Sequence, residues 1–154
     1  MTKTNVMKIL EQKKIPYNFY EYNPETTDGM EVAKSLGEEP TQVFKTLVTT
    51  DSQNHFFVFV IPVSKTLDLK GVAKIVNKKS IDMIKQKELF PLTGYIHGGC
   101  SPIGMKKKFV TYFDTSINNY EEIFVSAGRV GVQIKIKVTD LIKITDGQIG
   151  DLTL

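Results

Sequence analysis

Apolar and polar residues alternate along this chain with two different periods. Near the N-terminus, Val6, Ile9 and Leu10 recur at the spacing of one helical face, which predicts an amphipathic helix over residues 4–14. Pro16 ends that helix, because proline cannot continue the hydrogen-bonding pattern. The following residues, YNFYEY, have the composition of a short strand.

A second helix and a hairpin are predicted next. Residues 28–36 predict a helix, with Asp28 as its N-terminal cap and Gly37 in the left-handed position after its end. The segments VFKTLVTT and HFFVFVIP have strand composition and are separated by DSQN. Together they predict a β-hairpin.

The second half of the chain is predicted to be richer in strands. Asp68 is expected to cap a helix over LKGVAKIV, and short helical pieces are expected through residues 80–89. Further strands are predicted at YIH, FVTYFD, EIFVSAG and VQIKIKV, with a tight turn in SAGRVG. The closing TDLIKIT predicts a short helix that begins at Thr139 or Asp140.

This order of elements favours an α+β fold. We expect a mixed, curved sheet or partial barrel flanked by helices. At 154 residues, with no repeat and no Pro/Gly/Ser linker, the chain is expected to form a single domain over residues 1–154.

Composition narrows the class of protein. The chain has no apolar run near the ~20 residues that span a bilayer, and its N-terminus lacks the apolar core of a signal peptide. A single cysteine excludes an internal disulfide and fits a reducing compartment, so we expect a cytoplasmic protein.

Positive charge is concentrated in the middle of the chain. Residues 65–108 hold ten lysines and three acidic residues, a net charge of +7, whereas the segments on either side each have a net charge of −2. Such a segment is typical of a surface that faces phosphates, although a solvated lysine face would look the same.

The usual catalytic motifs are missing from the sequence. It contains two histidines and one cysteine, too few for a His/Cys metal site, and we expect no metal and no cofactor. No serine lies in G-x-S-x-G, and neither a phosphate-binding loop nor a dinucleotide fingerprint is present. Cys100 and His97 are close in sequence, but their spacing does not guarantee that the thiol and the imidazole face each other, so we favour a packing role for Cys100 over that of a nucleophile.

The segment GYIHGGCSPIGMKKK, residues 94–108, is the strongest candidate for a site. Its adjacent Gly98 and Gly99 allow main-chain N–H groups to approach a ligand closely, and Pro102 restricts the turn. Such a loop can donate to a phosphate or to the oxyanion of a carbonyl under attack. The lysines that follow favour the interpretation as an anion site over that of a simple connector.

Two charged residues stand out from their surroundings. Lys45 lies among the apolar strand residues of VFKTLV, where lysine is disfavoured, and alternation leaves open whether it faces solvent or a cleft. Asp140 is either a helix cap or a charge partner for a buried lysine.

Several of these motifs, in this order, resemble the YbaK/EbsC family of bacterial aminoacyl-tRNA deacylases. The shared stretches are VFKTL, KTLDLKGVAK, GYIHGGCSPIGMKKK, VSAGRVG and TDLIKI, with FYEYNP and DGMEVAKSLG before them. The resemblance covers roughly residues 5–151. It implies a free-standing relative of the editing domain inserted in bacterial prolyl-tRNA synthetases.

The function implied by this resemblance is trans-editing. Such a hydrolase cleaves the aminoacyl ester of mischarged Cys-tRNA(Pro), with Cys-tRNA(Cys) as a further candidate substrate. The family is thought to use no protein nucleophile, and the substrate's own thiol is expected to assist. The implied partners are mischarged tRNA and, in a ternary complex, prolyl-tRNA synthetase.

The resemblance also assigns roles to residues. Lys45 matches the essential lysine, and Gly98 and Gly99 match the loop whose backbone contacts the aminoacyl group. It further implies that Tyr20 and Asp140 line the substrate pocket, with Ser101 beside them, and that Lys106, Lys107 and Lys108 face the tRNA. His97 is a further candidate for a substrate contact because of its place next to the loop, and not because of the resemblance.

Alternatives remain open at this point. The substrate could be another mischarged tRNA, such as Ala-tRNA(Pro), because side-chain selectivity depends on the volume of the pocket. The chain could also be a non-catalytic module that binds tRNA or a nucleotide. We expect Cys100 to be dispensable in either case.

Overall fold

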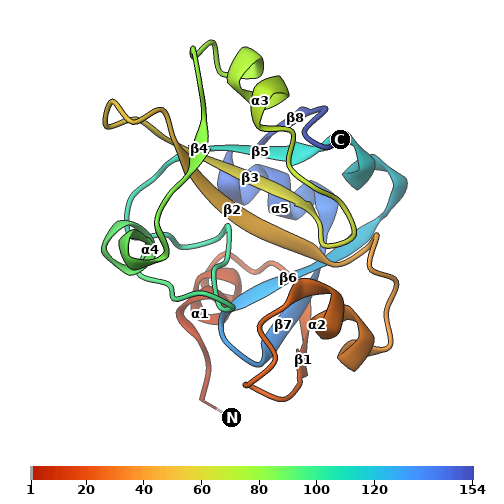
Figure 1. Cartoon of the computed structure of the whole chain (residues 1–154). Coiled ribbons are helices and arrows are strands. Elements are labelled where there is room, and N and C mark those ends of the chain that lie inside the picture. The colour runs from red at the N-terminus through yellow and green to blue at the C-terminus, as the bar shows by residue number, and fades with distance from the viewer. Residues whose placement is uncertain (1) are drawn as a thin grey trace.

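The computed structural model describes residues 2–154 and contains helices packed around two β-sheets (Figure 1). The smaller sheet has the strand order β1-β7-β6, with β1 at Tyr17–Glu21, β7 at Val132–Lys137 and β6 at Glu122–Arg129. The larger has the order β4-β2-β3-β5-β8, with β4 at Asp82–Met83, β2 at Phe44–Thr50, β3 at Phe56–Pro62, β5 at Val110–Asp114 and β8 at Gln148–Gly150. The α+β prediction is confirmed, with two sheets and no closed barrel.

The smaller sheet is antiparallel throughout and joins a strand near the N-terminus to two strands from the last third of the chain. β1 lies beside β7, so that Tyr20 is opposite Gln133, and β7 in turn lies beside β6. The hairpin of β6 and β7 closes through the predicted glycine turn, where Gly131 has a φ of +91°. Its register shifts between Ser126 and Arg129.

The larger sheet is mixed. β2 and β3 form the predicted antiparallel hairpin, in which Lys45 is opposite Ile61, whereas β5 runs parallel to β3 and β8 runs parallel to β5. The two sheets meet where Val43, next to β2, forms a bridge to Phe124 of β6. This junction places the residues of β2 next to those of β6 and β7.

Helices cover the sheets and contribute to the cores. α1 at Asn5–Gln12 buries Val6, Met7 and Leu10 against the largest apolar cluster, which also includes residues of β2, β3, β6 and β7. The remaining helices are α2 at Gly29–Leu36, α3 at Leu69–Ile75, α4 at Gln86–Thr93 and α5 at Val138–Thr145, with a 3-10 turn η1 at Thr115–Asn119. No helix formed by residues 2–154 is both long and apolar enough to span a lipid bilayer.

Several local predictions are confirmed by the backbone and its caps. The Asp28 carboxylate accepts a hydrogen bond from the Glu31 N–H at the start of α2, and Gly37 ends that helix with a φ of +68°. Asp68 caps α3 in the same way, by accepting from the N–H of Gly71.

Two predicted elements are wrong. Residues 95–97 do not form a strand, because the chain turns there and the Gly99 N–H donates to the carbonyl of Ile96 at 2.9 Å. Residues 80–89 do not form a series of helical pieces. They contain the short strand β4, and α4 begins only at Gln86 and continues through Pro91 to Thr93.

The last helix begins one residue earlier than predicted. α5 starts at Val138 and its N-terminal cap position is Lys137. Asp140 therefore lies within the first turn and is not the cap. A carboxylate in that turn still interacts favourably with the positive end of the helix dipole.

Candidate functional site

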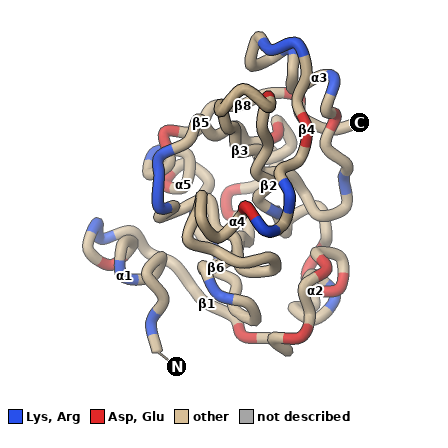
Figure 2. The backbone as a smooth tube through the Cα atoms, turned by 60° about the vertical axis from the view of Figure 1, so that its left-hand side comes forward, with Lys and Arg blue, Asp and Glu red and all other residues tan. Residues whose placement is uncertain are grey.

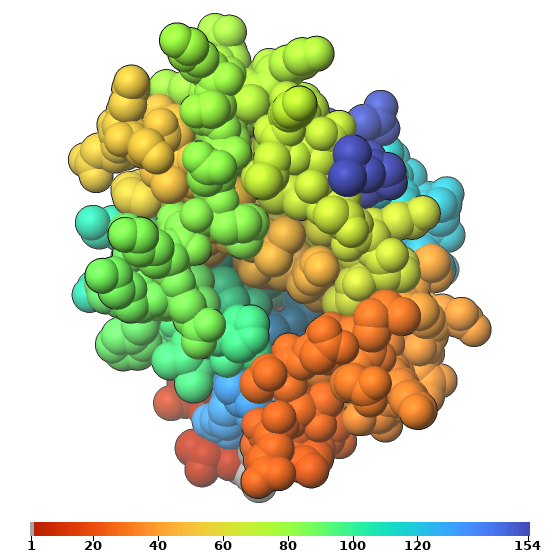
Figure 3. Space-filling view, viewed as in Figure 1, coloured from red at the N-terminus to blue at the C-terminus, as the bar shows by residue number. Residues whose placement is uncertain are grey.

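A cleft of about 360 Å³ opens where the two sheets meet. Figure 3 shows it as a hollow between the orange segment before α2 and the green loop after α4, with blue residues of the smaller sheet at its bottom. Its volume is near the lower end of the range for small-molecule sites, ~300–1,000 Å³. The lining side chains come from five residues of β2 and its edge, from the loop after α4, from the segment 22–32, and from Ser126 and Gln133 at the floor.

Lys45 lines this cleft, which settles the question left open by the sequence alternation. Its side chain is half-buried, and its ammonium makes no hydrogen bond or ion pair with any of residues 2–154. A charged amine without a partner in a cleft is available for a phosphate or a polarised carbonyl. Among the candidate residues, Lys45 is therefore the one whose position best fits its expected role.

The two adjacent glycines of the loop do different things. Gly98 lines the cleft with a φ of +88°, and a Cβ atom there would lie 2.8 Å from Cγ2 of Thr27. Gly99 does not line the cleft. A Cβ atom at Gly99 would lie 2.9 Å from the backbone nitrogen of Val130, so this glycine allows the loop to pack on the β6–β7 turn.

The N–H groups of the loop also differ, in whether they are hydrogen-bonded within the protein. The N–H of Gly99 is used within the loop, because it donates to the carbonyl of Ile96. The N–H groups of Gly98 and Cys100 donate to no acceptor among residues 2–154. Two residues of the cleft lining, Gly98 and Cys100, thus have N–H groups without an acceptor among residues 2–154, whereas the N–H of Gly99 is used.

Cys100 and His97 both line the cleft but show no nucleophile–base pairing. Burial raises the pKa of the Cys100 thiol to about 12, so the sulfur is protonated at neutral pH. His97 is exposed at the rim and makes no hydrogen bond to the thiol. A thiolate, not a thiol, is the attacking species in cysteine catalysis, so this pair lacks the chemistry of a cysteine hydrolase.

Three buried polar atoms in the described residues have no hydrogen-bond partner, and all three belong to side chains that line the cleft. They are the hydroxyl oxygens of Tyr22 and Thr46 and the amide oxygen of Gln133. Buried polar groups are nearly always paired with protein, water or ligand, so three such side-chain atoms around one cleft mark it as a candidate binding site for a polar molecule. None of these three residues was predicted from the sequence to belong to the site.

Some signal for them was present in the sequence. Thr46 is adjacent to Lys45, and Tyr22 lies at the end of the predicted strand YNFYEY. Gln133 is the uncharged member of the polar positions in VQIKIKV. None of these features distinguishes a cleft-lining residue from a solvated one before the two sheets are brought together.

Tyr20 and Ser101 lie outside this cleft. Tyr20 is 36% exposed, and its ring packs edge-on against Phe124 with 5.4 Å between centroids. Ser101 is fully buried, and its hydroxyl accepts a hydrogen bond from the Ile103 N–H at 3.2 Å. The structure gives both residues local packing or turn contacts.

Asp140 also does not line the cleft, and it forms no ion pair with Lys45 within 4.0 Å. The proposed role of Asp140 as charge partner of Lys45 is therefore not supported by this geometry. The half-buried carboxylate lies in the first turn of α5.

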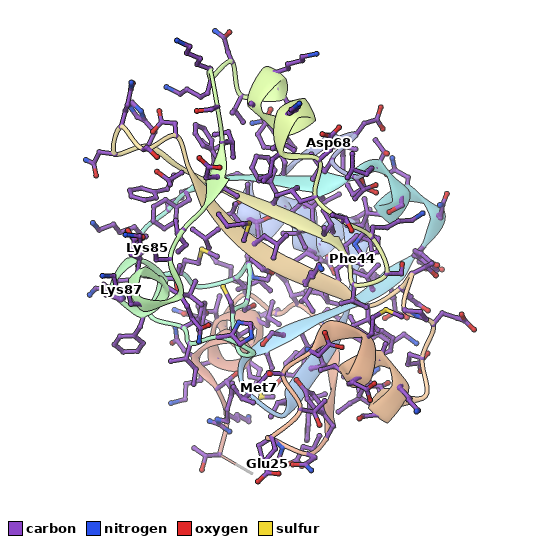
Figure 4. The ribbon with its side chains drawn as sticks, in the orientation of Figure 1. Met7, Glu25, Phe44, Asp68, Lys85 and Lys87 are labelled. Atoms are coloured by element: carbon purple, nitrogen blue, oxygen red, sulfur yellow. The ribbon has the colours of Figure 1, made fainter. Side chains whose placement is uncertain are left out.

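The lysines of the basic segment, residues 65–108, are distributed over three places on the surface. Lysines lie on and after α3, around α4, and in the stretch 106–108 that follows the loop (Figure 2). Lys85 and Lys87 extend at the outer edge of α4 (Figure 4). Lys106, Lys107 and Lys108 are all exposed, and Lys108 forms an ion pair with Asp146.

No group of three or more His, Cys, Asp or Glu side chains within residues 2–154 is placed to hold a metal ion. The chemistry available in the cleft consists of the Lys45 ammonium, the Asp28 carboxylate at the mouth, loop N–H groups without an acceptor among residues 2–154, and uncharged polar side chains. This set can bind and polarise a carbonyl ester.

Comparison with known proteins places the chain in a family. The model of the family described as "Aminoacyl-tRNA editing domain" matches residues 23–144. A protein of Enterococcus faecalis named "Putative Cys-tRNA(Pro)/Cys-tRNA(Cys) deacylase EbsC" is 44% identical over 153 aligned residues, which cover 98% of this chain and 93% of that protein.

Solved structures share the fold. A crystal structure of a "putative trans-editing enzyme for prolyl tRNA synthetase" superimposes with a TM-score of 0.88 at 22% identity, covering 99% of each chain. That of "hypothetical protein APE2540" has a TM-score of 0.90 at 20% identity and covers 98% of this chain and all of the other. The resemblance inferred from the sequence motifs is confirmed, and the chain belongs to the aminoacyl-tRNA editing domain family.

Proposed function

We propose that this protein is a free-standing hydrolase that cleaves the aminoacyl ester of mischarged Cys-tRNA(Pro). The observation that carries the proposal is the composition of the cleft. It holds the unpaired Lys45 ammonium and unused loop N–H groups, and its cysteine is kept as a thiol. The name of the E. faecalis relative supports the same substrate and adds Cys-tRNA(Cys) as a second one to test.

The proposed roles follow from the charges that develop during ester cleavage. As the carbonyl carbon is attacked, its oxygen becomes negative, and the N–H groups of Gly98 and Cys100 are the free donors available to stabilise it. The positive charge of Lys45 attracts the carbonyl oxygen of the ester, next to the 3′-terminal adenosine. Gly99 acts indirectly by fixing the loop on the β6–β7 turn.

The substrate is expected to supply the first nucleophile. The sulfur of the cysteinyl group attacks its own carbonyl carbon, the bond from that carbon to the ribose oxygen breaks, and the ribose oxygen takes up the thiol proton. Water then opens the resulting thioester to give free cysteine. The protein contributes positioning and electrostatic stabilisation, which can lower a barrier substantially without a reactive side chain.

The tRNA is proposed to approach across the basic segment. Lys106 and Lys107 follow the loop directly and have no ion-pair partner among residues 2–154, while Lys108 is partly neutralised by Asp146. Binding through lysines to phosphates predicts a steep loss of affinity with salt. Prolyl-tRNA synthetase is a further proposed partner, and the cytoplasm the proposed location.

Release of amino acid from purified, labelled tRNAs tests this function. The isolated chain should hydrolyse Cys-tRNA(Pro) and Cys-tRNA(Cys) faster than Ala-tRNA(Pro) and leave Pro-tRNA(Pro) intact. Preferential release of alanine would instead assign the protein to editing of that amino acid. Binding of all four tRNAs without release would identify a non-catalytic module.

A further inference from the structure

The floor of the cleft presents one polar side chain that its own sheet does not satisfy. Gln133 and Ser126 are opposite each other in the β6–β7 hairpin, and both line the cleft. The Ser126 hydroxyl already accepts a hydrogen bond from the Gly128 N–H at 3.2 Å. The side-chain amide of Gln133 makes no hydrogen bond with any of residues 2–154, although the residue is only 5% exposed.

The orientation of Gln133 follows from strand alternation. Its neighbours Val132 and Ile134 both belong to the main apolar core, so Gln133 must point to the opposite face of β7. That face carries the cleft. The amide is thus held by a strand in the middle of a sheet, where the backbone limits its freedom to turn towards solvent.

The amide oxygen of Gln133 can be paired only by a hydrogen-bond donor. The hydroxyls of Tyr22 and Thr46 can each donate or accept a hydrogen bond, whereas a carbonyl oxygen can only accept one. The buried Gln133 Oε1 therefore needs a donor, and residues 2–154 do not supply one. A ligand that places an N–H or O–H group at the floor would satisfy it.

An aminoacyl ester carries few donors that can reach the floor. The ribose hydroxyls lie on the tRNA side of the ester, and a thiol is a weak donor. The α-ammonium group carries three N–H bonds and a positive charge, and charge-assisted hydrogen bonds are about twice as strong as neutral ones. The α-ammonium is therefore the best match for Gln133 Oε1.

We infer that Gln133 is a specificity-determining residue that accepts a hydrogen bond from the α-ammonium group of the aminoacyl ester. The inference rests on the proposed function and adds a rule of substrate choice. The enzyme acts on esters with a free α-amino group and rejects esters whose nitrogen is acylated, such as peptidyl-tRNA. An N-acyl group removes the charge and adds atoms where the floor is already buried.

Asp28 is the competing partner for an ammonium group. Its carboxylate also lines the cleft, but it is exposed at the mouth and already caps α2 through the Glu31 N–H at 3.2 Å. An ammonium bound there would lie at the entrance, where an N-acyl group could extend into solvent. If Asp28 binds the ammonium, the protein should discriminate only weakly between esters with a free and an acylated α-amino group. If Gln133 binds it, the discrimination should be strong.

Binding of non-hydrolysable analogues tests the inference without requiring catalysis. Calorimetry would compare 3′-(L-cysteinylamino)-3′-deoxyadenosine with its N-acetyl derivative. The wild-type chain should bind the free amine about 10- to 100-fold more tightly, the range expected for one hydrogen bond to a charged group. Gln133→Met, of similar size but without the acceptor, should reduce the preference to about twofold or less.

Control variants separate this role from a structural one. Gln148→Met makes the same replacement at an exposed position of β8 and should leave the preference unchanged. Gln133→Glu keeps an acceptor and adds negative charge, so it should retain or increase the preference even if Gln133→Met folds poorly. Asp28→Asn keeps an oxygen for the helix cap and should retain the discrimination.

Specific results would overturn the inference. Equal affinity of the wild-type chain for the two analogues would do so, as would loss of the preference in Asp28→Asn together with its retention in Gln133→Met. If the preference depends on Gln133 but no tRNA is hydrolysed, the inference stands and the proposed catalytic function fails. In an active enzyme, N-acetyl-Cys-tRNA should be cleaved far more slowly than Cys-tRNA.

Discussion

Two polar clusters of this protein differ in their hydrogen bonding: one is paired within the chain and the other is not. At the tip of the β2–β3 hairpin, the carboxylate of Asp51 accepts hydrogen bonds from the N–H groups of Gln53 and His55, and it lies 2.7 Å from the His55 ring and 3.4 Å from the Lys78 ammonium. In the cleft, the side-chain polar atoms of Lys45, Thr46, Tyr22 and Gln133 have no partner among residues 2–154. Both clusters involve residues of β2 or its end, only a few positions apart in sequence.

The contrast separates polar groups that hold the fold together from those that await a ligand. Burial alone would raise the pKa of Asp51, but its hydrogen bonds and the charge of Lys78 outweigh burial and keep the pKa well below its ordinary value. That cluster fastens the hairpin tip to the segment after α3. The cleft residues, by comparison, leave hydrogen-bonding capacity unused in the folded protein, a cost that ligand binding removes.

The largest expected effect is that of Lys45→Met on activity. The substitution keeps the length of the side chain and removes its charge, so hydrolysis of Cys-tRNA(Pro) should fall by about 10²–10³-fold, as for loss of one electrostatic contact at a transition state. Single-turnover release of cysteine measures this rate. The exposed Lys34→Met in α2 is the matched control and should remain active; an active Lys45→Met would contradict the assigned role.

Thr46→Val is expected to have a smaller effect on activity. It should lower the rate of hydrolysis without lowering the stability of the fold. Valine replaces an unpaired buried hydroxyl by a methyl group of similar size, so the melting temperature should stay the same or rise. Activity should fall about tenfold if the hydroxyl contacts the substrate. A loss of both stability and activity would show that Thr46 belongs with the structural polar groups.

Asp51→Asn should do the reverse, by lowering stability and leaving the rate of hydrolysis unchanged at temperatures where the variant is folded. Because the pKa of Asp51 is lower in the folded chain than the ordinary ~3.9, its charge stabilises the fold above that pH, and the contribution is lost as the pH falls further. Melting curves of wild type and variant should therefore differ at pH 7 and converge in acid. A constant difference over that range would argue against a charged contribution.

The smallest effect on activity is expected from Cys100→Ala, which preserves the backbone N–H of the loop. The rate should change by no more than about threefold, because a thiol with a pKa near 12 supplies no nucleophile at neutral pH. In the wild-type chain, alkylation of Cys100 at pH 8 should be much slower when folded than in denaturant. An inactive Cys100→Ala would overturn the interpretation of the loop as a backbone cradle.

Local chemistry explains how much the sequence could predict. The caps Asp28 and Asp68, the helix end at Gly37 and the β2–β3 hairpin follow from nearby residues and were correct. YIH was wrongly predicted as a strand, because a three-residue apolar stretch carries no information on whether a partner strand exists. In the structure the main-chain groups there close a turn through Gly99.

The site was only partly predictable for a related reason. Lys45 and Gly98 were found because a lysine in an apolar strand and paired glycines are unusual by themselves. Tyr22 and Gln133 are ordinary residues until β1 pairs with β7 and the two sheets meet at the Val43–Phe124 bridge. Their unpaired atoms are a property of the assembled cleft, which no local pattern encodes.

The pairing of β1 with β7 also sets the time at which the site is completed during synthesis. Tyr22 is made early, but the strand that holds Gln133 leaves the ribosome only when most of the chain has been translated. Pairing between such distant segments is a slow step in folding, because the intervening chain must be ordered first. A nascent chain that stops before residue 132 therefore has no floor to its cleft, and editing activity appears only in an almost finished molecule.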